Sequence, residues 1–296
     1  MIKAFITGAT GFVGANLCNR LIKENVEVYV LVRETSNTSV FGDFKDKINI
    51  CKYNGTIETM QQIISRVKPD VVFHLAAYFV AEHNSKDINN LINSNISLGL
   101  YLLEAMKNEN VKYLINIGTN WQNYNSEQYN PVDLYAATKQ AFYDLAKYYT
   151  EATELRMITL KLCDTYGPKD FRPKLLSTLN RISETGESLK MSKGEQEMGF
   201  VYIDDVIDAI ICAMKSIIKM PEHYNEDFLV APEKFYSLKD VVKVFEDTVN
   251  KKVNIEWGKR EYRHREVMKI SNGKKLEGWN PKIDLKVGMT KTFSDK

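Results

Sequence analysis

The sequence is poor in cysteine and histidine, with four of each among 296 residues. The cysteines, at positions 18, 51, 163 and 212, lie far apart and form no C-x-x-C pair. We therefore expect no disulfide framework and no zinc site, and reduced thiols in a cytoplasmic protein are the ordinary interpretation of such usage. The histidines show no metal-ligand spacing either, so we expect no bound metal.

Excess charge of one sign is also absent, because the net charge is only +2 and both signs are interspersed. This balance argues against a nucleic-acid or membrane partner. The chain has no apolar run of membrane-spanning length and no charged-then-apolar leader, and no internal repeat. With 44% hydrophobic residues, its length suits one large α/β unit or two coupled domains.

A glycine-rich stretch near the start, residues 7–14, joins an apolar run at 2–6 to a helical pattern that begins at Ala15. Strand, glycine turn and helix are the context of a dinucleotide-binding site, where glycines let the backbone approach a pyrophosphate and the helix N-terminus faces the phosphates. An ordinary glycine turn is the alternative, but three glycines at this spacing favour the dinucleotide. The residues expected to contact it are Gly8, Thr10, Gly11, Phe12, Val13 and Gly14.

The second predicted strand, residues 26–32, is followed by Arg33. An arginine at this point suits the 2′-phosphate of NADP, whereas an acid suits the free ribose hydroxyl of NAD. Glu34 stands directly beside it, so NAD(H) stays open while NADP(H) is preferred. An arginine that is simply solvated at a strand end is the competing interpretation.

Strands and helices alternate up to about residue 165, which predicts an α/β fold with a doubly wound parallel (Rossmann) sheet. We expect an NAD(P)-binding domain over 1–165 and a smaller C-terminal α/β substrate domain over 166–296, with some elements returning to the first. The apolar run 71–75 fits a central buried strand. We expect His74 to be a core residue, and the cofactor to lie across Leu75, Ala76 and Ala77.

A catalytic group is predicted from Thr119, Tyr135 and Lys139. Thr119 ends a predicted strand at 111–118, on the rim where such sheets bind ligands. Tyr135 and Lys139 are four residues apart on a helix, so their Cβ atoms lie about 6 Å apart on one face. We expect the ammonium to lower the pKa of the tyrosine, which then exchanges a proton with a carbonyl or alcohol oxygen during hydride transfer. Thr119 would hydrogen-bond the same oxygen.

Taken together, these features resemble the extended short-chain dehydrogenase/reductases, the NAD(P)-dependent nucleotide-sugar epimerase/dehydratase/reductase family. The matching segments, which span almost the whole chain, are 7–14, 74–77, Asn95 before Gly99, Thr119, Tyr135 with Lys139, 166–168 and 201–205. The resemblance implies that Lys139 also holds the nicotinamide ribose, that Asn95 supports the proton relay and that Leu162 lies near the nicotinamide. It also implies a homodimer formed through the helices at 89–108 and 135–149.

The chain departs from that family's dehydratases directly after Thr119. Those enzymes carry an Asp-Glu pair there, whereas this chain has Asn120 and Trp121, which do not titrate usefully. The stretch 118–124, together with 164–168 and 172–175, is similar to the CDP-abequose/CDP-paratose synthase branch. This implies an NADPH-dependent reductase of the 4-keto group of a nucleotide-linked 4-keto-6-deoxy or 3,6-dideoxy hexose, in surface-polysaccharide biosynthesis. An NAD-dependent 4-epimerase is the leading alternative, and a non-catalytic cofactor-binding regulator is a remote one.

A nucleotide-sugar substrate needs cations for its pyrophosphate, and Arg172, Lys174 and Arg263 are the candidates. Each is about as well explained as a solvated surface charge. Asn120 is expected to face the sugar. Trp121 and Tyr124 are expected to form an apolar wall for a deoxysugar, with loop packing beneath the second domain as an equal alternative.

Overall fold

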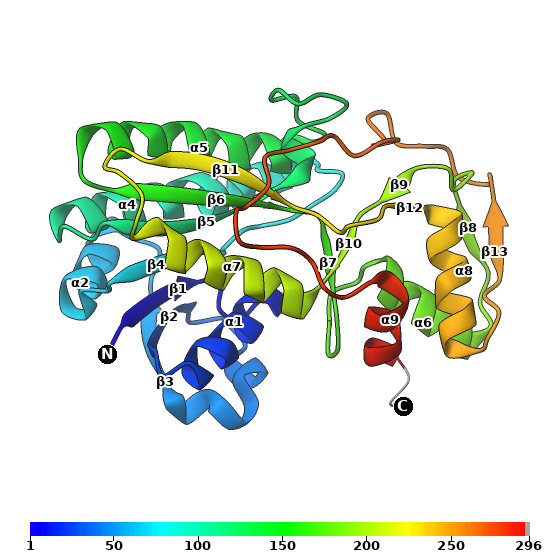
Figure 1. Ribbon diagram of the computed structural model, residues 1–296, viewed down its shortest axis with the longest axis horizontal. Coiled ribbons are helices and arrows are strands. Elements are labelled where there is room, and N and C mark those ends of the chain that lie inside the picture. The colour runs from blue at the N-terminus through cyan, green and yellow to red at the C-terminus, as the bar shows by residue number, and fades with distance from the viewer. Residues whose placement is uncertain (294–296) are drawn as a thin grey trace.

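A seven-stranded parallel sheet forms the centre of the computed structural model, which describes residues 1–293 (Figure 1). Its strand order is β11-β6-β5-β4-β1-β2-β3. The strands are β1 (Lys3–Thr7), β2 (Glu27–Arg33), β3 (Ile48–Tyr53), β4 (Val71–His74), β5 (Tyr113–Thr119), β6 (Arg156–Leu162) and β11 (Asn225–Val230). All four residues of β4 are buried, as expected for a central parallel strand with helices on both faces.

Helices cover both faces of this sheet and enclose two apolar cores (Figure 1). One face carries α1 (Phe12–Lys23) and α7 (Ile203–Ile217), which contact each other. The other face carries α2 (Ile57–Val67), α4 (Leu98–Asn108) and α5 (Leu134–Ala152). The predicted doubly wound α/β fold is thereby confirmed.

The strand order reverses between β1 and β4, and ligands of such sheets bind at the carboxyl ends of the strands beside this reversal. Thr7 ends β1 and His74 ends β4, so the glycine turn and Leu75 begin at this crevice. The fold thus brings together two segments that the sequence had marked separately for the cofactor.

A smaller lobe lies beside the carboxyl edge of the sheet (Figure 1). Among the described residues it contains three helices and three two-stranded sheets, joined by loops. Its elements are β7 (Asp164–Tyr166), α6 (Leu175–Thr185), β8 (Leu189–Met191), β9 (Glu197–Met198), β10 (Phe200–Tyr202), β12 (Tyr236–Ser237), α8 (Leu238–Val249), β13 (Ile255–Trp257) and α9 (Leu285–Phe293). Between these elements the chain crosses back, since α7 packs against the sheet and β11 pairs with β6.

One predicted helix differs in detail. Residues 88–108 form α3 (Ile88–Ile92), a π-helical turn η3 (Asn93–Ser97) and then α4. A π-helical turn inside an α-helix is typical of functional positions, because it re-aims one side chain. Here the turn contains Asn95, which is 1% exposed.

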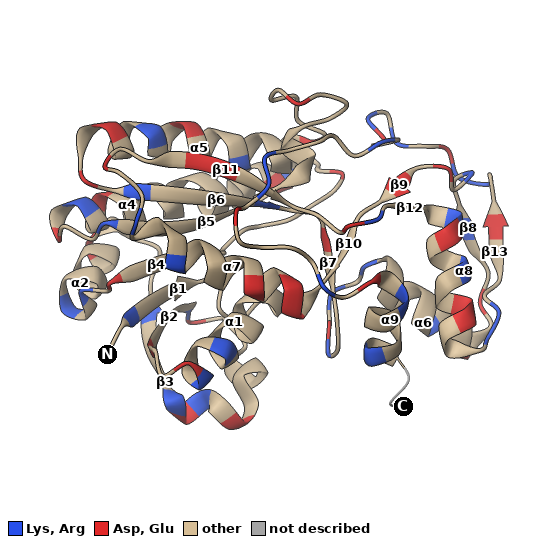
Figure 2. Ribbon diagram, viewed as in Figure 1, with Lys and Arg blue, Asp and Glu red and all other residues tan. Residues whose placement is uncertain are grey.

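Basic and acidic residues are distributed along the chain in both lobes (Figure 2). Within residues 1–293, no helix is long and apolar enough to span a membrane. No group of three or more His, Cys, Asp or Glu side chains that would suit a metal ion occurs in the same range.

Candidate active site

A cavity of about 510 Å³ lies at the reversal point of the sheet. The glycine turn, the end of β2, the segment after β4 and the π-helical turn supply most of its walls. The predicted cofactor residues that line it are Gly8, Thr10, Gly11, Arg33, Leu75, Ala76 and Ala77. The predicted residues outside its lining are Phe12, Val13, Gly14, Asn95, Tyr135, Lys139 and Leu162.

The glycine turn leaves no room for side chains. Gly8 has φ +71°, and a Cβ there would lie 2.5 Å from the backbone nitrogen of Ala76. A Cβ on Gly14 would overlap the carbonyl oxygen of Gly8. At the start of α1, Gly11 provides no side-chain cap and no acid stands in the first turn. The helix N-terminus therefore suits the pyrophosphate of a dinucleotide, which brings its own negative charge.

The floor of this cavity is organised by Thr7. Its Oγ1 accepts a hydrogen bond from Ala76 N at 3.2 Å and lies 2.8 Å from His74 Nδ1. Burial, together with the nearby Lys139, lowers the pKa of His74 to about 3. His74 is therefore a neutral core residue that fixes Thr7, as its place in a buried strand predicts.

The end of β2 presents a cation to the cavity. Arg33 is exposed and lines the cavity together with Ser36, whose Oγ accepts a hydrogen bond from Arg33 N at 3.0 Å. Glu34, the residue that argued against a phosphate, does not line it. Sequence reasoning missed three aromatic wall residues, Tyr53, Tyr101 and Phe171, because they come from segments that carry no cofactor motif.

Thr119 and the start of α5 bring together the three predicted catalytic residues, and this part of the sheet edge is called the rim below. Thr119 is the last residue of β5, and its Oγ1 accepts a hydrogen bond from Trp121 N at 3.3 Å. Asp133 caps α5 by accepting from Ala136 N at 2.7 Å. This cap fixes where the helix begins, so that Tyr135 and Lys139 share one face one turn apart.

The expected effect of Lys139 on Tyr135 is wrong. Burial raises the pKa of Tyr135, and the Asp133 carboxylate acts in the same direction. Burial also lowers the pKa of Lys139 to about 8. Burial and the Asp133 carboxylate thus both disfavour the phenolate, so the tyrosine is held in its protonated form.

Asn95 links the catalytic helix to the segment after β4. Its Nδ2 donates to Thr138 Oγ1 at 2.9 Å, and Thr138 directly precedes Lys139. The same amide accepts from Tyr78 N at 2.7 Å and donates to Tyr78 O at 3.1 Å. The amide of Asn95 therefore connects the backbone of Tyr78, the residue before Phe79, to α5.

A second cavity, of about 180 Å³, opens beside this rim. Its walls include the predicted substrate residues Asn120, Trp121, Lys174 and Arg263. Sequence reasoning missed Phe79, whose ring lies 5.0 Å from that of Tyr135 in an edge-on contact and 5.8 Å from that of Trp121. No motif marks Phe79, because its neighbours come from distant parts of the chain.

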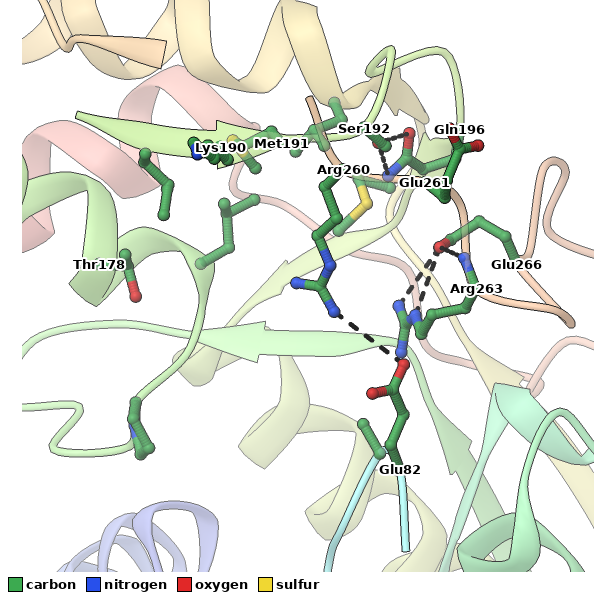
Figure 3. Close-up of a pocket in the computed structure, with 16 residues that line it drawn as sticks. Glu82, Thr178, Lys190, Met191, Ser192, Gln196, Arg260, Glu261, Arg263 and Glu266 are labelled. Carbon is green, nitrogen blue, oxygen red and sulfur yellow. Dashed lines mark hydrogen bonds and ion pairs between the residues drawn. The ribbon is translucent and has the colours of Figure 1, made fainter. Parts of the chain in front are cut away.

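A third and larger cavity, of about 520 Å³, adjoins the second (Figure 3). The two share Leu175, Met198, Arg263 and Glu266. Arg263 pairs with Glu266 at 3.2 Å, and its guanidinium lies 5.2 Å from the ring centre of Trp121. It therefore stands at the junction of a small chamber and a large one.

Two predicted substrate residues lie elsewhere. Arg172 lines neither chamber: its guanidinium pairs with Asp170, donates to Thr165 O at 2.7 Å and covers the ring of Phe12. Tyr124 also lies outside both, and the guanidinium of Arg265 packs 4.3 Å from its ring centre. Tyr124 thus matches the loop-packing alternative.

A dinucleotide cradle next to a Thr/Tyr/Lys rim defines an NAD(P)-dependent enzyme. Residues 4–225 match the family model described as the NAD dependent epimerase/dehydratase family. The chain belongs to this family.

Relatives and solved structures resemble the chain over its full length. It is 29% identical over 269 residues to a CDP-abequose synthase of Yersinia pseudotuberculosis, covering 90% of this chain and 91% of that protein. A CDP-abequose synthase of Salmonella muenchen is 27% identical, with coverages of 99% and 98%. The crystal structure of a UDP-glucose 4-epimerase from Thermotoga maritima has a TM-score of 0.86 at 21% identity, with coverages of 99% and 98%.

Proposed function

We propose that the protein is an NADPH-dependent reductase of the 4-keto group of a nucleotide-linked 4-keto-6-deoxy or 3,6-dideoxy hexose, with CDP as the favoured nucleotide. The observation that carries this proposal is the pair Asn120 and Trp121 directly after Thr119, both in the wall of the small chamber. Water elimination needs an acid and a base at the sugar, and neither residue supplies one. Without water elimination, the reaction that Thr119, Tyr135 and Lys139 can support is hydride transfer with a proton supplied by Tyr135.

The two adjoining chambers support a nucleotide-sugar substrate. The small chamber has room for a monosaccharide beside the rim, and the large one for a nucleotide. Arg263 stands where the two meet, so it would contact the pyrophosphate that joins them. Lys174, paired with Asp164 at 3.3 Å, is the second cation of the small chamber. The similarity to CDP-abequose synthases supports the same substrate class.

The cofactor cavity supports NADP(H). Arg33 and Ser36 together supply a cation and a hydroxyl to an adenosine 2′-phosphate, while Glu34 lies away from the cavity. Tyr53 and Tyr101 supply apolar walls.

A dinucleotide held by the glycine turn and Lys139 would supply the hydride for the C4 carbonyl carbon. Tyr135 donates its hydroxyl proton to the C4 oxygen, and Thr119 hydrogen-bonds the same oxygen as charge develops on it. The carbonyl becomes a secondary alcohol, since one hydride and one proton are added. Lys139 holds the nicotinamide ribose and stabilises the phenolate that the proton transfer leaves behind.

Cofactor stoichiometry tests this function. We expect one NADPH to be oxidised for each 4-keto sugar reduced, followed by absorbance at 340 nm and chromatography of the nucleotide sugar. A 4-epimerase would instead interconvert two sugars with tightly held NAD and no net consumption. Interconversion without consumption would replace the proposed reaction, and no hydride transfer with any CDP-, dTDP-, GDP- or UDP-linked keto sugar would leave a cofactor-binding regulator.

We also propose a homodimer through α4 and α5. The outer side of α5 exposes Leu145 and Tyr148 by 41% and 64%, and neighbouring α3 exposes Ile92 by 42%. Apolar side chains gathered on one helical face are typical of a subunit interface.

A further inference from the structure

Phe79 is a large aromatic residue that faces the sugar chamber rather than the core. Its side chain is 51% exposed, and it lines the small chamber. Its ring contacts those of Tyr135 and Trp121. The ammonium of Lys174 lies 5.8 Å from its ring centre, but that ammonium is already paired with Asp164. Two aromatic rings and one neutralised cation therefore surround Phe79.

The position of Phe79 is fixed by the catalytic helix itself. The preceding residue, Tyr78, is held on both its N–H and its C=O by the buried amide of Asn95. Asn95 in turn bonds to Thr138 of α5. Because α5 also carries Tyr135, these bonds tie the backbone next to Phe79 to the helix of the proposed proton donor.

Several charged side chains of the same chamber already have partners in the protein. Arg263 pairs with Glu266, and Glu197 accepts from Ile270 N at 3.1 Å. Arg265 donates to Pro131 O at 2.9 Å. A sugar hydroxyl pressed against the rings of Phe79 and Trp121 would lose its hydrogen bonds to water and gain no equivalent ones from those rings.

We propose that Phe79, together with Trp121, selects a sugar with a methyl group at C6 over one with a hydroxymethyl group. This inference rests on the proposed function. With the C4 oxygen at Tyr135, a group against Phe79 belongs to C3 or C5, the two neighbours of C4. Of these, C5 carries the carbon substituent that reaches an aromatic ring. A methyl group packs on that ring, whereas a hydroxyl there is left without a partner.

The test measures binding rather than turnover. Calorimetry with NADP⁺ present compares matched pairs: CDP-glucose with CDP-6-deoxyglucose, and the corresponding dTDP and UDP pairs. Within a pair the nucleotide contribution cancels. We expect the wild type to bind the 6-deoxy member about 10- to 100-fold more tightly, the discrimination that apolar pockets reach against an added hydroxyl. Phe79→Asn brings this ratio close to one, and Phe79→Leu keeps most of it.

The matched control is Tyr129→Asn, an aromatic residue of equal exposure, 50%, that lines none of the three chambers. It leaves the ratio unchanged. A wild-type ratio near one with intact binding overturns the inference alone, as does a ratio that Phe79→Asn does not alter. Failure of every nucleotide sugar to bind overturns the proposed function and this inference with it. An unchanged melting temperature and NADP⁺ affinity in Phe79→Asn separate a loss of selectivity from a loss of structure.

Discussion

The side-chain amide of Asn95 donates a hydrogen bond to Thr138 Oγ1 at 2.9 Å, with both residues buried. This bond joins the π-helical turn to the helix that carries Tyr135 and Lys139. The amide bonds Tyr78 as well, so one side chain links the π-helical turn, α5 and the segment after β4.

Asn95→Leu is therefore expected to lower the free energy of unfolding and to reduce the rate of turnover. The change leaves the backbone N–H and C=O of Tyr78 without their side-chain partners, which costs about 1–3 kcal/mol for each group, while Thr138 Oγ1 keeps its hydrogen bond to Tyr135 O. Chemical denaturation measures the loss in the free energy of unfolding. Thr138→Val is the matched control: it removes the bond from Asn95 and the bond from Thr138 Oγ1 to Tyr135 O, but leaves both bonds between Asn95 and Tyr78, and it should lose less. Equal stability of Asn95→Leu and the wild type would contradict this role.

Tyr135→Phe is expected to reduce kcat by about 10²- to 10⁴-fold, the contribution of a positioned proton donor. Its ring remains, so the edge-on contact with Phe79 persists. Affinity for NADPH, measured by fluorescence titration, should stay within about twofold because only the hydroxyl is lost. Near-normal turnover would show that another group supplies the proton.

Lys139 makes stability depend on pH. Its pKa is lowered by burial to about 8, below the value of about 10.4 in an unfolded chain. Between these values the unfolded chain binds more protons, so stability rises with pH through this window. Below about pH 8 the cost of the buried charge is fully present, on the order of 3 kcal/mol.

Lys139→Met is consequently expected to be inactive but more stable than the wild type at pH 7. The difference in melting temperature should shrink as the pH rises from 8 towards 10, where the wild-type lysine is also neutral in the folded state. Calorimetric melting at several pH values measures it. The exposed Lys147 serves as the control position, since Lys147→Met removes a charge that is already solvated. A wild type that stays more stable than Lys139→Met at pH 7 would contradict a buried charge at this site.

Local chemistry explains why the glycine turn and the Tyr135/Lys139 pair were found from the sequence. The spacing of Gly8, Gly11 and Gly14 between a strand and a helix fixes a phosphate cradle within eight residues. A helical i, i+4 pair likewise needs only one turn. Such features depend on neighbours along the chain, so one sequence suffices.

Features that depend on packing between distant segments could not be found in this way. Phe79 becomes part of the site only because Trp121 and Tyr135 are brought against it. Arg172 and Arg263 look equivalent in the sequence, but Asp170 and Phe12 hold the first away from the chambers. The predicted direction of the Tyr135 pKa shift was wrong for the same reason. Burial of the tyrosine depends on residues from several segments, and it raises the pKa.

Arg33→Ala is expected to raise KM for NADPH by about 10- to 100-fold, because a charge-assisted contact to the 2′-phosphate is lost. KM for NADH should change little, since NADH lacks that phosphate. Initial rates with both cofactors measure the ratio. Glu34→Ala is the control, and it should keep the preference because Glu34 does not line the cavity. An equal rise in KM for both cofactors would mean that Arg33 does not contact the 2′-phosphate.

The exposed face of α5 leads to the remaining prediction. Leu145→Asp combined with Tyr148→Asp places two carboxylates on the proposed interface, where burial of an unpaired charge is strongly unfavourable. We expect this variant to sediment as a monomer in analytical ultracentrifugation while the wild type sediments as a dimer. Ile218→Asp, at a residue 53% exposed beyond the end of α7, is the control and should remain dimeric. A wild type that is monomeric at micromolar concentration would contradict the proposed interface. The exposed apolar side chains of α5 would then need another explanation.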